Sequence, residues 1–194
     1  MAEEGIKKNS LVRKILLVIL CVLLVSELVL ILFADDILRR YYKTDYEDLV
    51  GKYAELYEVP AELVNAVIFC ESGFRADAES GAGAKGLMQM RDASFGEMRE
   101  RLGLPAGDVF DPEQNIQCGV YCLSYLKRYF GSWNTALAAY NGGIGNVQNW
   151  LKDPSYSTDG KTLTFIPFAE TRAYVEKVNR VRRAYEILYA GKGN

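Results

Sequence analysis

The sequence predicts an all-α domain that is preceded by a single membrane-spanning helix. After residue 46, apolar residues recur at helical spacing almost throughout, and no sustained run of alternating strand residues appears. Near the N-terminus, the apolar stretch from Ile15 to Phe33 approaches the roughly 20 residues that a spanning helix needs. We therefore predict four segments: a tail at 1–14, a transmembrane anchor at 15–34, a spacer at 35–46 and a folded domain at 47–194.

The charges that flank the apolar stretch predict its orientation. Cytoplasmic flanks of spanning helices are enriched in lysine and arginine, which puts the N-terminus inside and the folded domain outside the cell membrane. A cleaved signal peptide is the alternative, but its apolar region is usually about 7–15 residues long and ends at small residues, where this chain has Leu32. The charged residues are Lys7, Lys8, Arg13 and Lys14 before the stretch, and Asp35 and Asp36 after it.

Within the folded domain, turn residues divide the helical pattern into five main helices. Proline opens a helix readily and glycine often follows its end, so Pro60, Pro112 and Pro167 predict starts while Gly73 and Gly131 predict stops. The region 152–166 is predicted to be a loop with room for a small hairpin, because it contains Asp-Pro and Asp-Gly pairs. The helices are expected around 49–56, 60–72, 112–130, 133–140 and 167–188, with a shorter one at 144–151.

The composition excludes several classes of enzyme. The chain has no histidine, so it cannot form a Ser-His-Asp triad, a Cys-His pair or an HExxH zinc site. A carboxylate must then do any general acid–base work near neutral pH. A net charge of −2 gives no indication of a nucleic-acid partner, and no motif indicates a metal or organic cofactor. Cys70 is expected to be a buried thiol, with a bridge to Cys118 or Cys122 as the alternative.

Glu71 is the candidate catalytic residue. It follows Val64 and Val67 on the apolar face of its helix, in the last turn, where burial and the helix dipole both raise a carboxyl pKa. A carboxyl that stays protonated near neutral pH can give a proton to a glycosidic oxygen. The alternative is a plain ion pair between Glu71 and Arg75, four residues on.

Five motifs in order give the chain a resemblance to a known family. ESGF, GAKGLMQ, DPEQNIQCGVYCLSYL, ALAAYNGG and ETRAYV together resemble lytic transglycosylases of the soluble-murein-transglycosylase type, over roughly 53–185. The resemblance implies a goose-type lysozyme-like helical fold that acts on peptidoglycan. It also implies cleavage of the β-1,4 bond between N-acetylmuramic acid and N-acetylglucosamine, with formation of a 1,6-anhydromuramyl end.

The resemblance further assigns the site residues. Glu71 occupies the position of the catalytic acid and base, and a single carboxylate suffices because the C6 hydroxyl of the sugar replaces water as nucleophile. Asp77, Glu79 and Asp92 remain candidates for a second carboxylate, which a hydrolase would use. The implied substrate-binding residues are Ser72, Ser80, Gln89, Met90, Asn115, Tyr140, Asn141 and Tyr174.

Three functions therefore stay open at this stage. The first is a membrane-anchored peptidoglycan lytic transglycosylase, and the second is a muramidase-type hydrolase on the same fold. The third is a catalytically idle glycan-binding module. An anchored enzyme would work near the membrane, beside cell-wall synthesis or secretion machinery.

Overall fold

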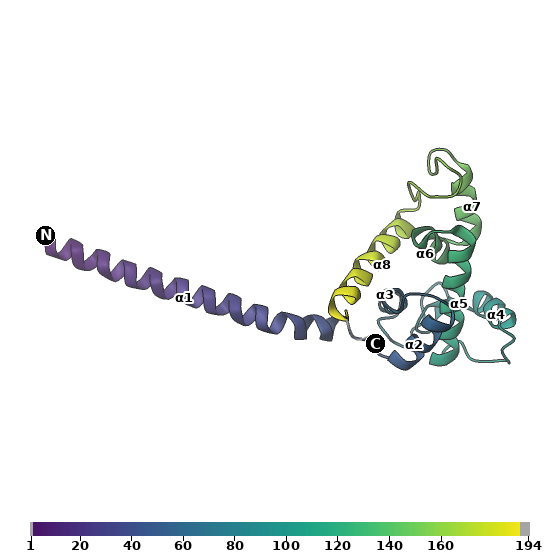
Figure 1. Ribbon diagram of the computed structural model, residues 1–194, viewed down its shortest axis with the longest axis horizontal. Coiled ribbons are helices and arrows are strands. Elements are labelled where there is room, and N and C mark those ends of the chain that lie inside the picture. The colour runs from purple at the N-terminus through teal and green to yellow at the C-terminus, as the bar shows by residue number, and fades with distance from the viewer. Residues whose placement is uncertain (1, 191–194) are drawn as a thin grey trace. The chain divides into compact units, whose positions relative to one another are not determined.

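The computed structural model describes the backbone of residues 2–190 and the side chains of residues 13–190. The chain falls into two units, which meet between Lys43 and Thr44. The first unit consists of the long helix α1, Ala2–Tyr41 (Figure 1). The second unit contains all the other helices and the short strands.

Helix α1 contains a stretch suited to a membrane. Between Arg13 and Tyr41 it is long and apolar enough to cross one, and the most apolar 18 residues of that stretch have a mean hydropathy of 3.3 and are not buried by other parts of the described chain. The helix continues through much of the segment predicted as a spacer, where Asp35 accepts a hydrogen bond from Arg39 Nε at 2.7 Å. Such i,i+4 pairs stabilise a helix, which explains why regular structure extends beyond Phe33.

The second unit is almost entirely helical, as the sequence predicts. The helix start predicted at Pro60 and the helix end predicted at Gly131 are confirmed. Helix α3 begins directly after Pro60, and α5 ends at Gly131, which has a left-handed φ of 74°. The helices are α2 (Glu47–Leu56), α3 (Ala61–Glu71), α4 (Asp92–Arg101), α5 (Pro112–Phe130), α6 (Trp133–Gly142), α7 (Ile144–Lys152) and α8 (Ala169–Leu188).

Two local features differ from the sequence-based expectation. Helix α4 was not predicted, because only Phe95 and Met98 of its residues are buried and the apolar pattern is too sparse. The only strands of the described chain are β1 (Ala84–Lys85) and β2 (Met90–Arg91), which pair antiparallel around a tight turn. The hairpin that was allowed for at 152–166 does not form, and that region is loop.

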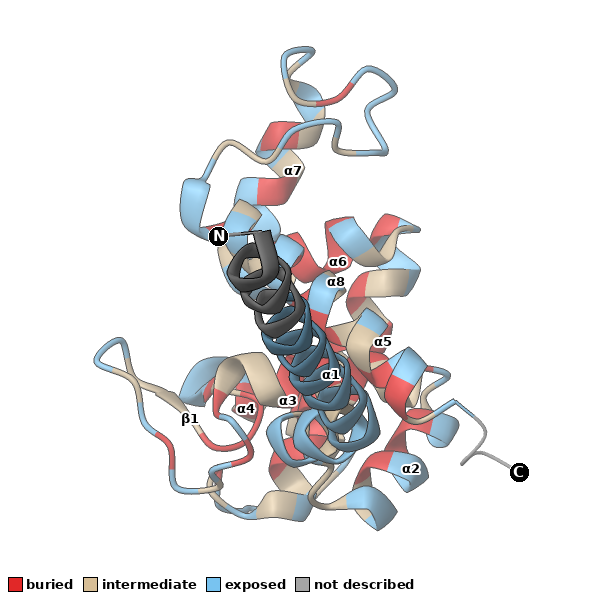
Figure 2. Ribbon diagram, turned by 90° about the vertical axis from the view of Figure 1, so that its left-hand side faces the viewer, coloured by how far each residue is buried: buried red, intermediate tan, exposed pale blue. Residues whose placement is uncertain are grey.

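The core of the domain surrounds α3. Leu63, Val64, Val67 and Ile68 are completely buried, and α3 packs most extensively against α8 (Figure 2). Helix α6 also packs on α8, and α5 packs on α2, α4 and α6. Helix α3 thus carries Glu71, at its last position, out of the centre of the core.

Candidate active site

Glu71 has the environment of a proton donor. It is the last residue of α3, it is only partly accessible, and burial raises the pKa of its carboxyl from 4.5 to about 7. Burial acts in this direction because an ionised carboxylate loses hydration in a low-dielectric surrounding. A raised pKa of this kind favours the protonated form of Glu71 closer to neutral pH than for an ordinary glutamate.

Two tyrosines lie beside this carboxyl, each from a different helix. The charge of Glu71 contributes to raising the pKa of both Tyr140, near the end of α6, and Tyr174, in α8, although burial is the larger cause for each. The Tyr174 hydroxyl is buried and has no partner at full hydrogen-bond geometry among the described residues, but its interaction with Glu71 lowers the pKa of that carboxyl. The Glu71 carboxyl is thus enclosed by polar aromatic side chains.

Lys177 is a third neighbour of Glu71, and the sequence analysis missed it. Its ammonium group donates a hydrogen bond to the Cys70 carbonyl at 3.4 Å, and its charge lowers the pKa of Glu71. Lys177 lies three residues after Tyr174, so the two share one face of α8. That spacing was a usable signal, because the motif already placed Tyr174 near the glutamate.

The alternative interpretation of Glu71, an ion pair with Arg75, is not supported, since no such pair forms among the described residues. Arg75 is exposed and instead donates from Nε to the Ser72 carbonyl at 3.0 Å. None of the candidate second carboxylates contributes to the pKa of Glu71, which depends on burial, Tyr174 and Lys177. Asp92 is held by Lys85 at 2.9 Å, well exposed to solvent.

A glycine-containing turn, Gly86–Gln89, lies between β1 and β2 and is fastened by three helices. Ser72, at the end of α3, donates from Oγ to the Leu87 carbonyl at 2.8 Å. Tyr140 of α6 donates from its hydroxyl to the Met88 carbonyl at 2.7 Å. These bonds connect the two helix ends that surround Glu71 to one turn.

Asn115 of α5 supplies the third attachment and is fully buried. Its Oδ1 accepts from the backbone N–H of Met88 at 2.8 Å, and its Nδ2 donates to the carbonyls of Lys85 at 3.1 Å and Val109 at 2.7 Å. Only glycine fits at position 86, because φ is 75° and a Cβ atom there would lie 2.3 Å from Asn115 Nδ2. Asn115 therefore holds the backbone of the Gly86–Gln89 turn in place through these hydrogen bonds.

Gln89 adopts an unusual backbone conformation in this turn. Its φ of 49° is in the left-handed region, which is uncommon for a residue other than glycine and is found often at functional sites. Its Nε2 donates to the carbonyls of Ala78 and Gly86, each at 3.0 Å. Because these two carbonyls use both N–H donors of the amide, its oxygen is the group that Gln89 can offer to a ligand.

The other predicted substrate-binding residues differ in exposure. Ser80 is partly exposed, and its Oγ accepts from the backbone N–H of Ala84 at 3.0 Å, so it shapes the loop before the turn. Met90 is buried, with an accessible fraction of 3%, whereas Asn141 is exposed at the end of α6. Contact of these residues with a substrate stays a prediction.

The four cysteines are free thiols. Cys118 is buried in α5 and Cys70 is partly buried beside Glu71, so the expectation of thiols rather than a bridge is confirmed. Burial raises the pKa of the Cys70 thiol to about 11, which keeps it protonated and poorly reactive at neutral pH.

The partly buried carboxyl of Glu71, with its raised pKa, is suited to general acid–base catalysis. The chain belongs to the family described as "Transglycosylase SLT domain", whose model matches residues 48–163, more than half of the chain. This membership confirms the resemblance seen in the sequence.

Named relatives and solved structures agree with this family. The chain is 32% identical over 160 residues to the "Soluble lytic murein transglycosylase" of Escherichia coli strain K12, covering 79% of this chain and 24% of that protein. It is 34% identical over 165 residues to the "Membrane-bound lytic murein transglycosylase C" of Pectobacterium atrosepticum, covering 72% of this chain and 46% of that protein. The chain thus spans about a quarter to a half of the length of these relatives.

The fold is similar to that of solved lytic transglycosylases. An inactive mutant of Slt from Pseudomonas aeruginosa, in which a glutamate is replaced by glutamine, superposes with a TM-score of 0.69 at 32% identity, covering 79% of this chain and 26% of that one. The 70 kDa soluble lytic transglycosylase of Escherichia coli gives a TM-score of 0.70 at 29% identity, covering 79% and 26%. The predicted all-α, lysozyme-like fold is therefore confirmed.

Proposed function

We propose that this protein is a peptidoglycan lytic transglycosylase that uses Glu71 as its only catalytic carboxyl. The substrate bond is the β-1,4 bond between N-acetylmuramic acid and N-acetylglucosamine, and the product carries a 1,6-anhydromuramyl end. The observation that carries the proposal is the pKa of Glu71, raised to about 7 by burial, with no second carboxylate contributing to it. Membership in the transglycosylase family supports the substrate class.

The proposed reaction needs one proton carrier. Protonated Glu71 gives its proton to the glycosidic oxygen as the bond from that oxygen to the muramyl anomeric carbon breaks. The Glu71 carboxylate then takes the proton of the muramyl C6 hydroxyl, and that oxygen bonds to the anomeric carbon. Glu71 ends the cycle protonated, and water is not consumed.

The surrounding residues have supporting roles in this proposal. Tyr174 and Lys177 stabilise the carboxylate that forms after the first proton transfer, since both lower the pKa of Glu71. The oxygen of the Gln89 amide and the exposed Asn141 are the polar groups available for the sugar or its N-acetyl group. Ser72, Tyr140 and Asn115 position the Gly86–Gln89 turn through the hydrogen bonds described above.

The products distinguish this proposal from the two alternatives. Purified peptidoglycan is digested with the full chain in detergent and with its Glu71→Gln variant, and the products are analysed by mass spectrometry. We expect anhydromuramyl ends from the unchanged protein alone. Reducing muramyl ends would mean that water is the nucleophile, as in a muramidase, and glycan binding without any product would support the binding module.

The pH dependence of cleavage tests the role of Tyr174. Glu71 must be protonated to start the reaction, so kcat/KM should fall as the pH rises through about 7. The Tyr174 hydroxyl lowers the pKa of Glu71, so in Tyr174→Phe the alkaline limb should move to higher pH. The measurement is the pH profile of kcat/KM for both proteins, with Tyr189→Phe at the far end of α8 as the control. A limb that stays in place would contradict a direct effect of Tyr174 on Glu71.

We further propose that α1 anchors the domain in the cell membrane, with the N-terminus in the cytoplasm and the domain outside. The apolar stretch from Arg13 to Tyr41 and the membrane-bound relatives support this location. An anchored enzyme would trim glycan near the membrane, beside cell-wall synthesis or secretion machinery. Protease protection of each terminus in sealed spheroplasts tests the orientation, and the reverse pattern of protection would overturn it.

A further inference from the structure

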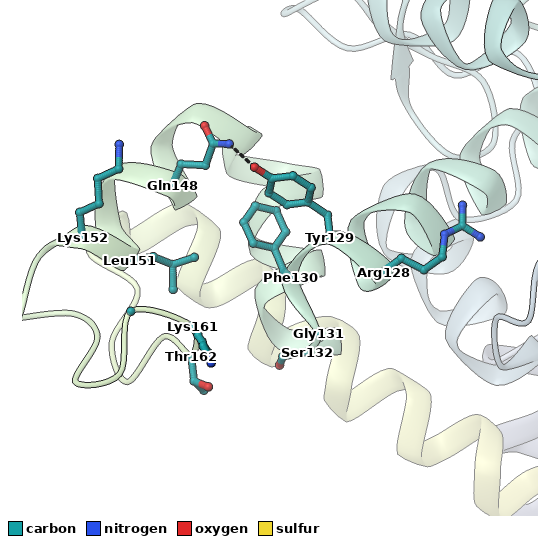
Figure 3. A pocket seen from close by; sticks show the side chains of 11 residues that line it. Arg128, Tyr129, Phe130, Gly131, Ser132, Gln148, Leu151, Lys152, Lys161 and Thr162 are labelled. Carbon is teal, nitrogen blue, oxygen red and sulfur yellow. Dashed lines mark hydrogen bonds between the residues drawn. The ribbon is translucent and has the colours of Figure 1, made fainter.

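The domain has a cavity whose lining includes no residue of the candidate active site. The cavity has a volume of about 790 Å³ and lies between the end of α5, the end of α7 and the loop that follows α7 (Figure 3). Cavities of about 300–1,000 Å³ are typical of ligand sites. Helix α6 separates the cavity from the catalytic region, because Ser132 lines the cavity and Tyr140 lies about 12 Å further along that helix.

One wall of the cavity is held in place by a side-chain hydrogen bond. Gln148 of α7 donates from Nε2 to the Tyr129 hydroxyl at 2.6 Å, as Figure 3 shows. The Tyr129 ring also packs edge-on against Phe130, with centroids 4.8 Å apart, but the residue keeps 53% of its surface accessible. Leu151 adds an apolar patch to the same lining.

The opposite wall is an ordered loop. Asp159 Oδ1 accepts from the backbone N–H groups of Lys161 at 2.8 Å and Thr162 at 2.6 Å, and these bonds lower the pKa of the Asp159 carboxyl to about 2. The loop that carries the Lys161 and Thr162 side chains is therefore pre-formed before any ligand binds. Pre-formed walls reduce the entropy lost on binding.

The cavity has two cations without acidic partners. Lys152 and Lys161 line it, and neither forms an ion pair with any residue that the structure describes. The acids next to them in sequence are engaged by the backbone, since Asp153 accepts from Ser155 N at 2.8 Å and Asp159 closes the loop. The Arg128 guanidinium and the Lys152 ammonium both point outward in Figure 3, and Arg128 donates to Ser124 Oγ at 3.1 Å. Lys161 is therefore the main cation of the cavity, and Lys152 lies at its edge.

We propose that this cavity binds the acidic stem peptide of peptidoglycan, at a site separate from the one that cleaves the glycan. A lysine without an acidic partner favours carboxylate ligands, and a stem peptide carries carboxylates along its length. A glycan strand without peptides offers only the lactyl carboxylate of its muramic acid residues. Leu151 and the Tyr129 ring suit the short aliphatic side chains of such a peptide. The proposal rests on the proposed function, since it takes peptidoglycan as the substrate.

Binding of an isolated stem tetrapeptide tests the site without any cleavage. The full chain carrying Glu71→Gln is kept in detergent, and a stem tetrapeptide freed of sugar is titrated into it by calorimetry. We expect binding that weakens at least tenfold in Lys161→Glu. The matched control is Arg183→Glu, an exposed cation of α8 outside the cavity, for which binding should stay within twofold. Lys152→Gln provides a milder second variant, and circular dichroism checks that each variant is folded.

Three outcomes would overturn the proposal. The first is equal peptide binding by the Lys161→Glu and Arg183→Glu proteins. The second is displacement of the peptide by an equal concentration of inorganic phosphate, which would indicate a site for any anion. The third is binding of uncharged N-acetylglucosamine oligomers that is lost in Tyr129→Ala, which would indicate a sugar site. Failure of the proposed function is a separate result, namely no anhydromuramyl ends from the protein with intact Glu71.

Discussion

Replacing Glu71 by glutamine is expected to lower the rate of glycan cleavage by about 10³-fold, since general acid–base catalysis typically contributes 10²–10⁴-fold. Glutamine has nearly the same shape as the protonated carboxyl but cannot give up a proton. The measurement is the initial rate of anhydromuramyl product release from purified glycan strands. Glu79→Gln is the matched control, because Glu79 is an exposed carboxylate in the same region of the chain, and its rate should stay within a factor of two.

The Glu71→Gln variant is expected to be at least as stable as the unchanged protein, and to be more stable than it above neutral pH. The folded-state pKa of Glu71 is about 7, above its ordinary value of 4.5, so the folded state binds more protons between these values. The contribution of Glu71 to the free energy of unfolding therefore declines as the pH rises from about 4.5 to 7, by about 3 kcal/mol in total. Glutamine does not ionise, so the variant does not show this decline. Chemical denaturation at pH 5 and pH 8 checks it. A variant that is less stable at both values would mean that the rate loss reflects misfolding.

Asn115→Ala is expected to destabilise the domain by about 3 kcal/mol, because it removes three hydrogen bonds in a fully buried place and leaves two carbonyls and one N–H without partners. The midpoint of urea unfolding measures this change. Asn134→Ala is the control, since Asn134 is exposed and accepts a hydrogen bond from Asn179 Nδ2 at 2.8 Å, and should change stability by about 0.5 kcal/mol or less.

Activity adds a second readout for Asn115. Because Asn115 supports the Gly86–Gln89 turn, the alanine variant should lose activity even under conditions where it is fully folded. Asn115→Ala with normal stability would contradict the account of the turn given above. A destabilised variant with full activity at low temperature would mean that the turn does not depend on this side chain.

The sequence predicted those parts of the fold that depend on local patterns. Helix α3 follows from Pro60 and the apolar spacing that ends at Glu71, and the burial of Glu71 follows from the same spacing. Helix α4 was missed because two buried residues among polar ones give too weak a period. The short strands around Gly86 were missed because two residues carry no alternation at all.

The candidate site was predictable where residues lie within one motif and not where they meet across the fold. The motifs identified Glu71, Tyr140 and Tyr174, but which backbone carbonyls Ser72 and Tyr140 bind depends on how α3 and α6 approach the turn. Lys177 lies outside the motif, and although its spacing from Tyr174 puts both on one face of α8, its effect on Glu71 depends on the packing of α8 on α3. Tertiary contacts of this kind leave no period in the sequence.

The packing of α8 on α3 also determines when the surroundings of Glu71 are complete. Protein chains are synthesised from the N-terminus, and Tyr174 follows Glu71 by about a hundred residues. Until α8 has emerged and packed on α3, Glu71 lacks both Tyr174 and Lys177, the two side chains that lower the pKa of its carboxyl. The charge environment of Glu71 is therefore assembled from both ends of the domain and depends on the last helix that the structure describes.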